Sequence, residues 1–140
     1  MGLLYSATQT STALSTSADA ISLKAAAARS FILREFTMSG MGTSSSANEV
    51  QLARNTGGTI ATALAGLNAS APTSGTSFGV GQGTTVTTTL YRFALNANGV
   101  LFRWVGPPGA CFEVQGATQL GWRSVSGTSN AVSSCTIEEF

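Results

Sequence analysis

Short β-favouring runs separated by turn signals constrain the fold of this chain more than any other feature. The run 84–95 is rich in Thr, Leu, Tyr and Phe, and the pair Asn98-Gly99 that follows it is typical of a β-hairpin turn. Such turn signals recur about every eight to twelve residues, and no convincing helical segment lies between them. The sequence therefore predicts an all-β fold, an antiparallel β-sandwich of the jelly-roll type in a single domain.

The predicted strands share β-favouring or alternating residues, and they are 30–38, 48–56, 84–95, 100–105, 111–114, 118–126 and 131–140. The run 48–56 alternates, so Val50 and Leu52 are expected on one face of their strand. Residues 25–28 suit either a helix or a strand. The glycine-rich segment 66–83 is expected to be a long surface loop that contacts a neighbouring molecule.

The N-terminal segment differs from the rest of the chain. Residues 1–17 contain many Ser and Thr and few large apolar side chains, so we expect an extended N-terminal arm or a disordered tail. Residues 18–140 are expected to form the β-sandwich domain. The segment has neither the basic start nor the long apolar core of a signal peptide. No apolar run in the chain reaches the roughly 18 residues that a membrane span needs, so we expect no membrane partner.

Charged residues are scarce. Only 9% of the residues are charged, against about 25% in ordinary soluble domains. A surface with so few charges is poorly solvated, which favours an oligomer or a larger assembly that covers it with protein. The basic residues are scattered and form no run, which argues against nucleic-acid binding through phosphate contacts.

The residue types that most enzymes use are missing or badly placed. The chain contains no histidine, which removes the commonest general base and the commonest metal ligand. Glu138 and Glu139 are adjacent, but neighbours on a strand point to opposite faces and cannot act as a catalytic pair. The glycines 79, 81 and 83 precede a strand-like run, whereas a phosphate-binding loop precedes a helix. We therefore predict a protein that is not an enzyme and holds no cofactor or metal.

Two further features allow a structural and a functional interpretation. Cys111 and Cys135 each open a short β-favouring run, CFEV and CTIEE, so they form either a disulfide across a sheet or two small buried thiols. On the strand 100–105, Trp104 is expected in the core and Arg103 on the surface, paired with a carboxylate. Alternatively, an exposed Arg and Trp together offer a cation–π or carbohydrate-binding surface. The structural interpretation fits the neighbouring GPPG segment, which has the composition of a rigid turn.

Several short motifs resemble those of the capsid decoration proteins, or cement proteins, of tailed phages. They are Asn48, Val50, Arg54 and Thr56; Arg103, Trp104, Val105, Pro108 and Gly109; residues 121–125; and Glu138, Glu139 and Phe140. The resemblance covers roughly residues 32–140. The chain departs from the family pattern at Ala47, where an Asp is usual, and at 61–70, where a Pro and an Asp are usual.

The resemblance implies a jelly-roll-like protein that forms homotrimers on the expanded phage head, assembled in the host cytoplasm and carried on the outer surface of the virion. Its partner would be the major capsid protein, and it would stabilise the shell against the pressure of packaged DNA. The residues that the resemblance and the spacing single out for structural or interface roles are Arg54, Thr56, Arg103, Trp104, Glu138 and Glu139.

The alternative hypothesis is a tail- or fibre-associated module, or a carbohydrate-binding β-sandwich. Such a module would present aromatic side chains at its surface, and the candidates are Tyr91, Trp104 and Trp122.

Overall fold

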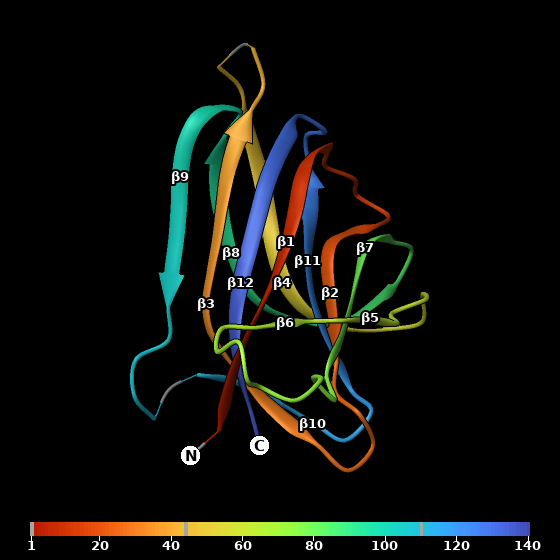
Figure 1. Cartoon of the computed structure of the whole chain (residues 1–140). Helices are drawn as coiled ribbons and strands as arrows, with labels where there is room; N and C mark the ends of the chain where they lie inside the picture. The colour runs from red at the N-terminus through yellow and green to blue at the C-terminus, as the bar shows by residue number, and fades with distance from the viewer. Residues whose placement is uncertain (1, 44, 110) are drawn as a thin grey trace.

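A computed structural model describes residues 2–43, 45–109 and 111–140, and these residues form two antiparallel six-stranded sheets and no helix (Figure 1). The sheets pack face to face, which confirms the predicted β-sandwich. The first sheet contains β1 (Leu3–Ala13), β3 (Ser30–Met41), β6 (Ala65–Gly66), β9 (Asn98–Val105), β10 (Phe112–Gln115) and β12 (Asn130–Glu139). The second contains β2 (Asp19–Lys24), β4 (Ala47–Thr56), β5 (Thr62–Ala63), β7 (Ser77–Gln82), β8 (Thr85–Asn96) and β11 (Gln119–Ser126).

The core lies between the two sheets and is built from the residues that point inward along each strand. Phe36 of the first sheet stacks on Trp122 of the second, with 5.3 Å between ring centroids, and both side chains are fully buried. Val50 and Leu52 are also fully buried, as their alternation predicts. This aromatic centre joins the sheets because large rings bury much apolar area and stack favourably when offset.

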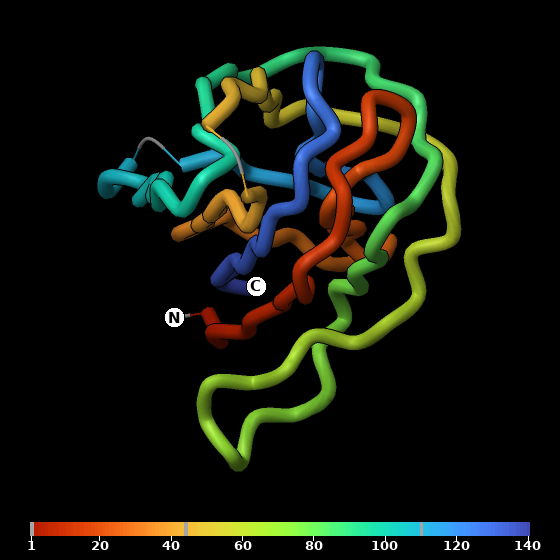
Figure 2. The backbone as a smooth tube through the Cα atoms, turned by 90° about the horizontal axis from the view of Figure 1, so that it is seen from above, coloured from red at the N-terminus to blue at the C-terminus, as the bar shows by residue number. Residues whose placement is uncertain are grey.

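The N-terminal segment is a strand of the sandwich rather than an arm outside it. Residues 3–13 form β1, which pairs antiparallel with β12 along its length and with β6 on its other side. Figure 2 shows β1 and β12 side by side. Tyr5, Ala7 and Gln9 point inward and are buried, while the Ser and Thr residues between them face outward. The predicted N-terminal arm is therefore wrong for residues 3–13. The alternating pattern of this strand is short, and the Ser and Thr residues of its outer face resemble those of a loop or tail.

The glycine-rich segment also differs from its prediction. Ser77–Gln82 form strand β7, paired antiparallel with β2, where a surface loop was expected. The preceding residues do form a long loop, which projects away from the sheets in Figure 2. Gly79 allows the segment before β5 to lie close to β7, because a Cβ at this position would lie 3.0 Å from the backbone oxygen of Thr59. Because Gly79 and Gly81 interrupt β7, the sequence shows no alternating pattern from which this strand could be predicted.

A β-bulge in β3 changes the direction of two charged side chains. Thr136 pairs with Glu35 and Ile137 pairs with Leu33, so Arg34 is the extra residue on β3. Leu33 and Phe36 on either side are buried, whereas Arg34 and Glu35 are both partly exposed. The bulge therefore places two consecutive charged residues on the outer face of the first sheet.

The connection from β7 to β8 crosses the outer face of the second sheet. β7 pairs with β2 and β8 pairs with β4, while β11 lies between β2 and β4. Only Gly83 and Thr84 join β7 to β8. The side chain and carbonyl of Thr84 contact Arg123 of β11, so this connection passes over the outer face of the central strands.

Candidate functional site

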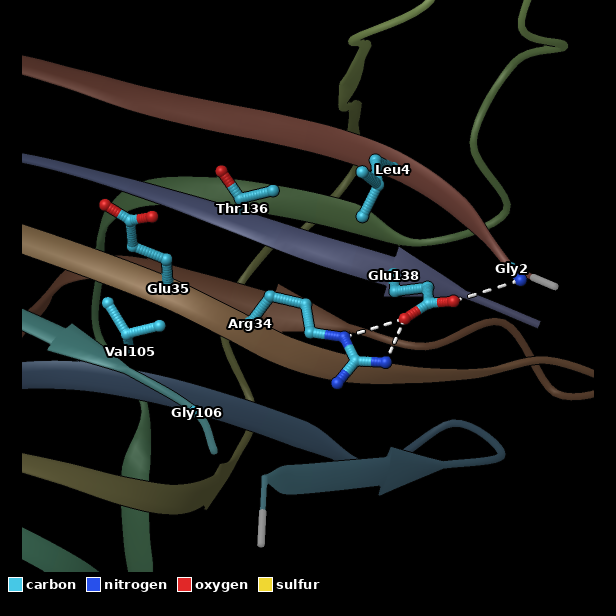
Figure 3. A pocket seen from close by; sticks show the side chains of 8 residues that line it. All are labelled: Gly2, Leu4, Arg34, Glu35, Val105, Gly106, Thr136 and Glu138. Atoms are coloured by element: carbon cyan, nitrogen blue, oxygen red, sulfur yellow. Dashed lines mark hydrogen bonds and ion pairs between the residues drawn. The ribbon is translucent and has the colours of Figure 1, made fainter. Parts of the chain in front are cut away.

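A recess of about 420 Å³ lies on the outer face of the first sheet, where strands β1, β3, β9 and β12 come together (Figure 3). Its lining combines apolar, small and charged residues: Gly2, Leu4, Arg34, Glu35, Val105, Gly106, Thr136 and Glu138. Of the residues singled out from the sequence, Glu138 lines this recess and Arg103 pairs with one of its members.

Two ion pairs neutralise the charges around the recess. The Arg34 guanidinium donates from Nε to Glu138 Oε2 at 2.7 Å, and its Nη2 donates to the same oxygen. Arg103 Nε donates to Glu35 Oε1 at 2.7 Å and Nη2 donates to Oε2 at 3.2 Å. These hydrogen bonds hold the pKa of Glu138 and the pKa of Glu35 below the usual 4.5. The recess is therefore a concave, partly apolar surface whose charged groups neutralise one another.

Glu139 points the opposite way from Glu138, as adjacent residues on a strand must. Its side chain is buried and accepts hydrogen bonds from Gly75 N at 3.0 Å, Thr76 N at 2.5 Å and Ser74 Oγ at 3.2 Å. Burial acts to raise the pKa of Glu139, but the donors of Thr76, Gly75 and Ser74 outweigh burial and hold the pKa below its usual value. Glu139 therefore fastens the end of the long loop to the sandwich.

Arg103 and Trp104 follow the structural interpretation in most respects. Arg103 is exposed and pairs with Glu35, as expected for a surface Arg beside a carboxylate. Trp104 stacks on Phe36 at 5.8 Å between centroids and contacts Phe112 in a tilted arrangement at 4.9 Å, yet it is half-buried rather than part of the sealed core. It lies on β9, whose only pairing partner among the described strands is β3, so one side of the ring stays open.

Arg54 and Thr56 lie apart from Arg103 and Glu138, at the opposite sheet. Arg54 Nη2 reaches across the end of the sandwich and donates to the Glu113 carbonyl at 2.9 Å. With Thr118, Arg54 lines two cavities of about 260 and 210 Å³. Thr56 is exposed at the end of β4 and lines the smaller cavity. The residues singled out from the sequence therefore occupy separate places and do not form one site.

Cys111 and Cys135 are both free thiols, so the disulfide hypothesis is wrong. β3 lies between β12, which carries Cys135, and β10, which Cys111 precedes. Two strand spacings are about 10 Å, well beyond the reach of a disulfide. Cys135 is buried in the core, and burial raises the pKa of its thiol to about 12. Cys111 is half-buried, and its thiol donates to the Pro107 carbonyl at 3.3 Å.

A buried polar cluster lies beneath the β7–β8 connection, and sequence reasoning missed it. The Asp19 carboxylate accepts hydrogen bonds from Ser22 Oγ at 2.5 Å, Thr84 Oγ1 at 2.6 Å and Arg123 Nε at 2.7 Å, and also from Asn55 Nδ2. All five residues are at least nine-tenths buried. No local signal predicts the cluster, because its members come from four separate segments of the chain.

Several large apolar side chains are exposed along the edge formed by β8 and β9. β8 is an edge strand of the second sheet, and β9 is an edge strand of the first sheet. Phe93 of β8 stacks on Phe102 of β9 with 3.7 Å between centroids, closing the interior. Outside this stack, large apolar side chains remain exposed: Tyr91, Val100, Leu101 and Val105. We call these four residues the β8–β9 apolar strip.

Of the three aromatic residues singled out for a carbohydrate-binding surface, Tyr91 and Trp104 remain accessible. Trp122 is fully buried, so it cannot contact a ligand at the surface. Tyr91 is 41% exposed, and Trp104 is half-buried. Their rings lie within the same aromatic group as Phe36 and Phe102, which packs into the sandwich.

Within residues 2–43, 45–109 and 111–140, no three His, Cys, Asp or Glu side chains lie close enough together to hold a metal ion. The described part of the chain also lacks any helix long and apolar enough to cross a membrane. No protein-family model matches the sequence, and no curated protein matches it.

Proposed function

We propose that this chain is a capsid decoration, or cement, protein of a tailed-phage head. In this role it binds the outer surface of the expanded shell as a homotrimer and contacts the major capsid protein. It is a structural protein without catalysis or a cofactor, and it needs neither nucleic acid nor a membrane for binding. The added contacts between capsid subunits resist the outward pressure of packaged DNA.

The β8–β9 apolar strip is the observation that carries this proposal. Val100 and Leu101 are 52% and 61% exposed, on a strand whose outer edge has no partner among the described residues. Covering apolar surface with protein is worth about 25 cal/mol per Å². Unpaired edge strands also offer backbone groups that a neighbouring chain can bind. Both properties favour a protein that works in contact with other protein surfaces.

The scarcity of charge supports the same conclusion. The chain has seven Lys and Arg and six Asp and Glu, and four pairs of them form ion pairs in the structure. The outward residues of β1 and β8 are mostly Ser and Thr. Neutral hydroxyl groups lose less hydration energy than free Lys or Glu when a partner covers them. Three linked copies then combine individually weak contacts through their effective concentration.

Copy number in purified virions tests the proposal directly. Quantitative mass spectrometry of phage particles that carry this chain should give a simple ratio to the major capsid protein. A handful of copies per particle would instead support the tail or fibre hypothesis. Absence of the chain from purified particles would overturn both virion roles.

A pair of matched variants tests whether the β8–β9 apolar strip is the contact surface. Leu101→Glu places a charge on the strip, and we expect a folded protein that loses trimer formation or shell binding. Leu67→Glu is the control, because Leu67 is similarly exposed, at 56%, but lies in the long loop. Equal shell binding by both variants would remove the strip from the interface. Glycan-array binding that depends on Tyr91 would favour the carbohydrate-binding alternative.

A further inference from the structure

The buried polar cluster holds a hydroxyl group and a primary amide on the same carboxylate. Thr84 Oγ1 donates to Asp19 Oδ2 at 2.6 Å, and Asn55 Nδ2 donates to the same oxygen. One carboxylate oxygen therefore contacts both a hydroxyl group and the nitrogen of a primary amide. Thr84 belongs to the β7–β8 connection and Asn55 to β4, so the two groups come from segments that cross each other.

We propose that Thr84 and Asn55 form an intramolecular ester cross-link, with Asp19 as the proton-transfer group. Asp19 Oδ2 takes the hydroxyl proton while Thr84 Oγ1 forms a bond to the Asn55 side-chain carbonyl carbon. The tetrahedral intermediate then breaks its carbon–nitrogen bond. Asp19 returns the same proton to the departing nitrogen, which leaves as ammonia. The reaction needs no other reagent, because a hydroxyl and a primary amide give an ester and ammonia.

The surroundings support the roles of these three groups. Arg123 Nη2 donates to Thr84 Oγ1 and, at 2.8 Å, to the Thr84 carbonyl, so a positive charge stands beside the oxygen that loses its proton. Arg123 Nε also holds the other Asp19 oxygen at 2.7 Å, which fixes the carboxylate in place. Thr84 is 7% exposed and Asn55 is 3% exposed, so water is kept from hydrolysing the product.

Gly121 provides the space in which the carboxylate and the amide meet. A Cβ at this position would lie 2.6 Å from Asp19 Oδ2 and 2.6 Å from Asn55 Nδ2. Any larger residue would displace both groups from the face of β11. The absence of a side chain at Gly121 therefore allows the arrangement on which the reaction depends.

The reaction is expected to be slow. Asn55 Oδ1 has no hydrogen-bond partner among the described residues, so nothing there stabilises the negative charge of the intermediate. The cross-link should therefore accumulate after folding, over hours to days, rather than during synthesis.

Intact mass spectrometry of the full chain, freshly purified and after incubation at 37 °C, tests the proposal. The folded protein should lose about 17 Da, the mass of one ammonia, and a proteolytic digest should contain one species that joins the Asn55 and Thr84 peptides. A mass that stays at the sequence value throughout would overturn the proposal. This measurement uses the natural chain and does not depend on the capsid role.

The variants Thr84→Ser and Thr84→Val separate the ester from other losses of ammonia. Serine keeps the hydroxyl, so Thr84→Ser should still form the joined peptide, whereas Thr84→Val should not. The Asn98-Gly99 pair can lose the same mass by cyclising on its own backbone, and Thr84→Val leaves that reaction intact. A mass loss that maps only to Asn98, or a joined peptide in Thr84→Val, would overturn the proposal.

Discussion

The outer faces of the two sheets carry similar charged groups under very different conditions. On the second sheet, the β7–β8 connection covers the Asp19–Arg123 pair, whose side chains are 1% and 6% exposed. On the first sheet, nothing among the described residues covers the Glu35–Arg103 pair, whose side chains are 32% and 58% exposed. The hydrogen-bond distances are alike, at 2.7 Å. Solvent access, rather than pairing geometry, should therefore decide how much each pair matters to stability.

The largest expected effect comes from breaking the buried pair on one side. Asp19→Ala leaves the Arg123 charge buried without its partner and removes an acceptor from three other side chains. We expect a loss of about 3–5 kcal/mol in the free energy of unfolding, measured by urea denaturation. Replacing both Asp19 and Arg123 with apolar residues should cost much less. An Asp19→Ala variant as stable as the natural chain would show that covering the pair does not raise its importance.

The two tryptophans sharpen the comparison between the closed and open sides. Trp122 is fully buried on the second sheet, whereas Trp104 is half-buried at the edge of the first. Trp122→Ala should cost about 3–5 kcal/mol, the usual range for a buried aromatic ring. Trp104→Ala should cost clearly less, because its ring already contacts water. Urea unfolding of both variants checks this order, and equal losses would place Trp104 in the core.

Acid should weaken the sandwich through the carboxylates outside the buried cluster. The pKa values of Glu139, Glu138 and Glu35 lie below 4.5 in the folded chain. Their ionised forms therefore stabilise the fold above pH 4.5, and this contribution is lost as the pH falls through the folded pKa values. The urea midpoint should stay level from neutral pH to about pH 5 and then fall. Glu139→Gln should make the fall shallower, and an unchanged slope would rule out Glu139 as a contributor.

The smallest effect is expected at the Arg92–Glu49 pair. Its side chains are 53% and 43% exposed, at the edge of the second sheet that the β7–β8 connection does not cover. Arg92→Ala should change the unfolding free energy by less than about 1 kcal/mol, and added salt should make even that difference smaller. Urea unfolding at low and high salt measures both effects. A loss as large as that of Asp19→Ala would show that solvent access does not decide how much an ion pair contributes.

Local sequence signals predicted the features that depend on neighbours in the chain. The alternation around Val50 and the divergence of Glu138 and Glu139 each need only a few consecutive residues. The hairpin predicted at Asn98-Gly99 is wrong, because both residues lie within β9, which pairs with β3, whereas β8 pairs with β4 in the other sheet. The β3 bulge was missed because the sequence does not encode pairing register locally. β1 was missed because only Tyr5, Ala7 and Gln9 mark its inner face.

The polar cluster could not be predicted from any local sequence pattern. Asp19, Asn55, Thr84 and Arg123 become neighbours only after β7, β2, β11, β4 and β8 have taken their order in the sheet. The sequence showed each as an ordinary polar residue. Their burial depends on Gly83 and Thr84 crossing the sheet, which is a property of topology rather than of composition.

The position of β12 has a consequence for how the chain can fold during synthesis. β12 is the last described strand in the chain, yet it lies between β1 and β3 in the middle of the first sheet. A nascent chain that has emerged only as far as Ser129 leaves both strands with unpaired edges. Folding must therefore wait for sequence-distant partners, which slows it. During that wait, the vacant slot can accept β12 from another copy, so crowded polysomes are where exchanged strands and aggregates should first form.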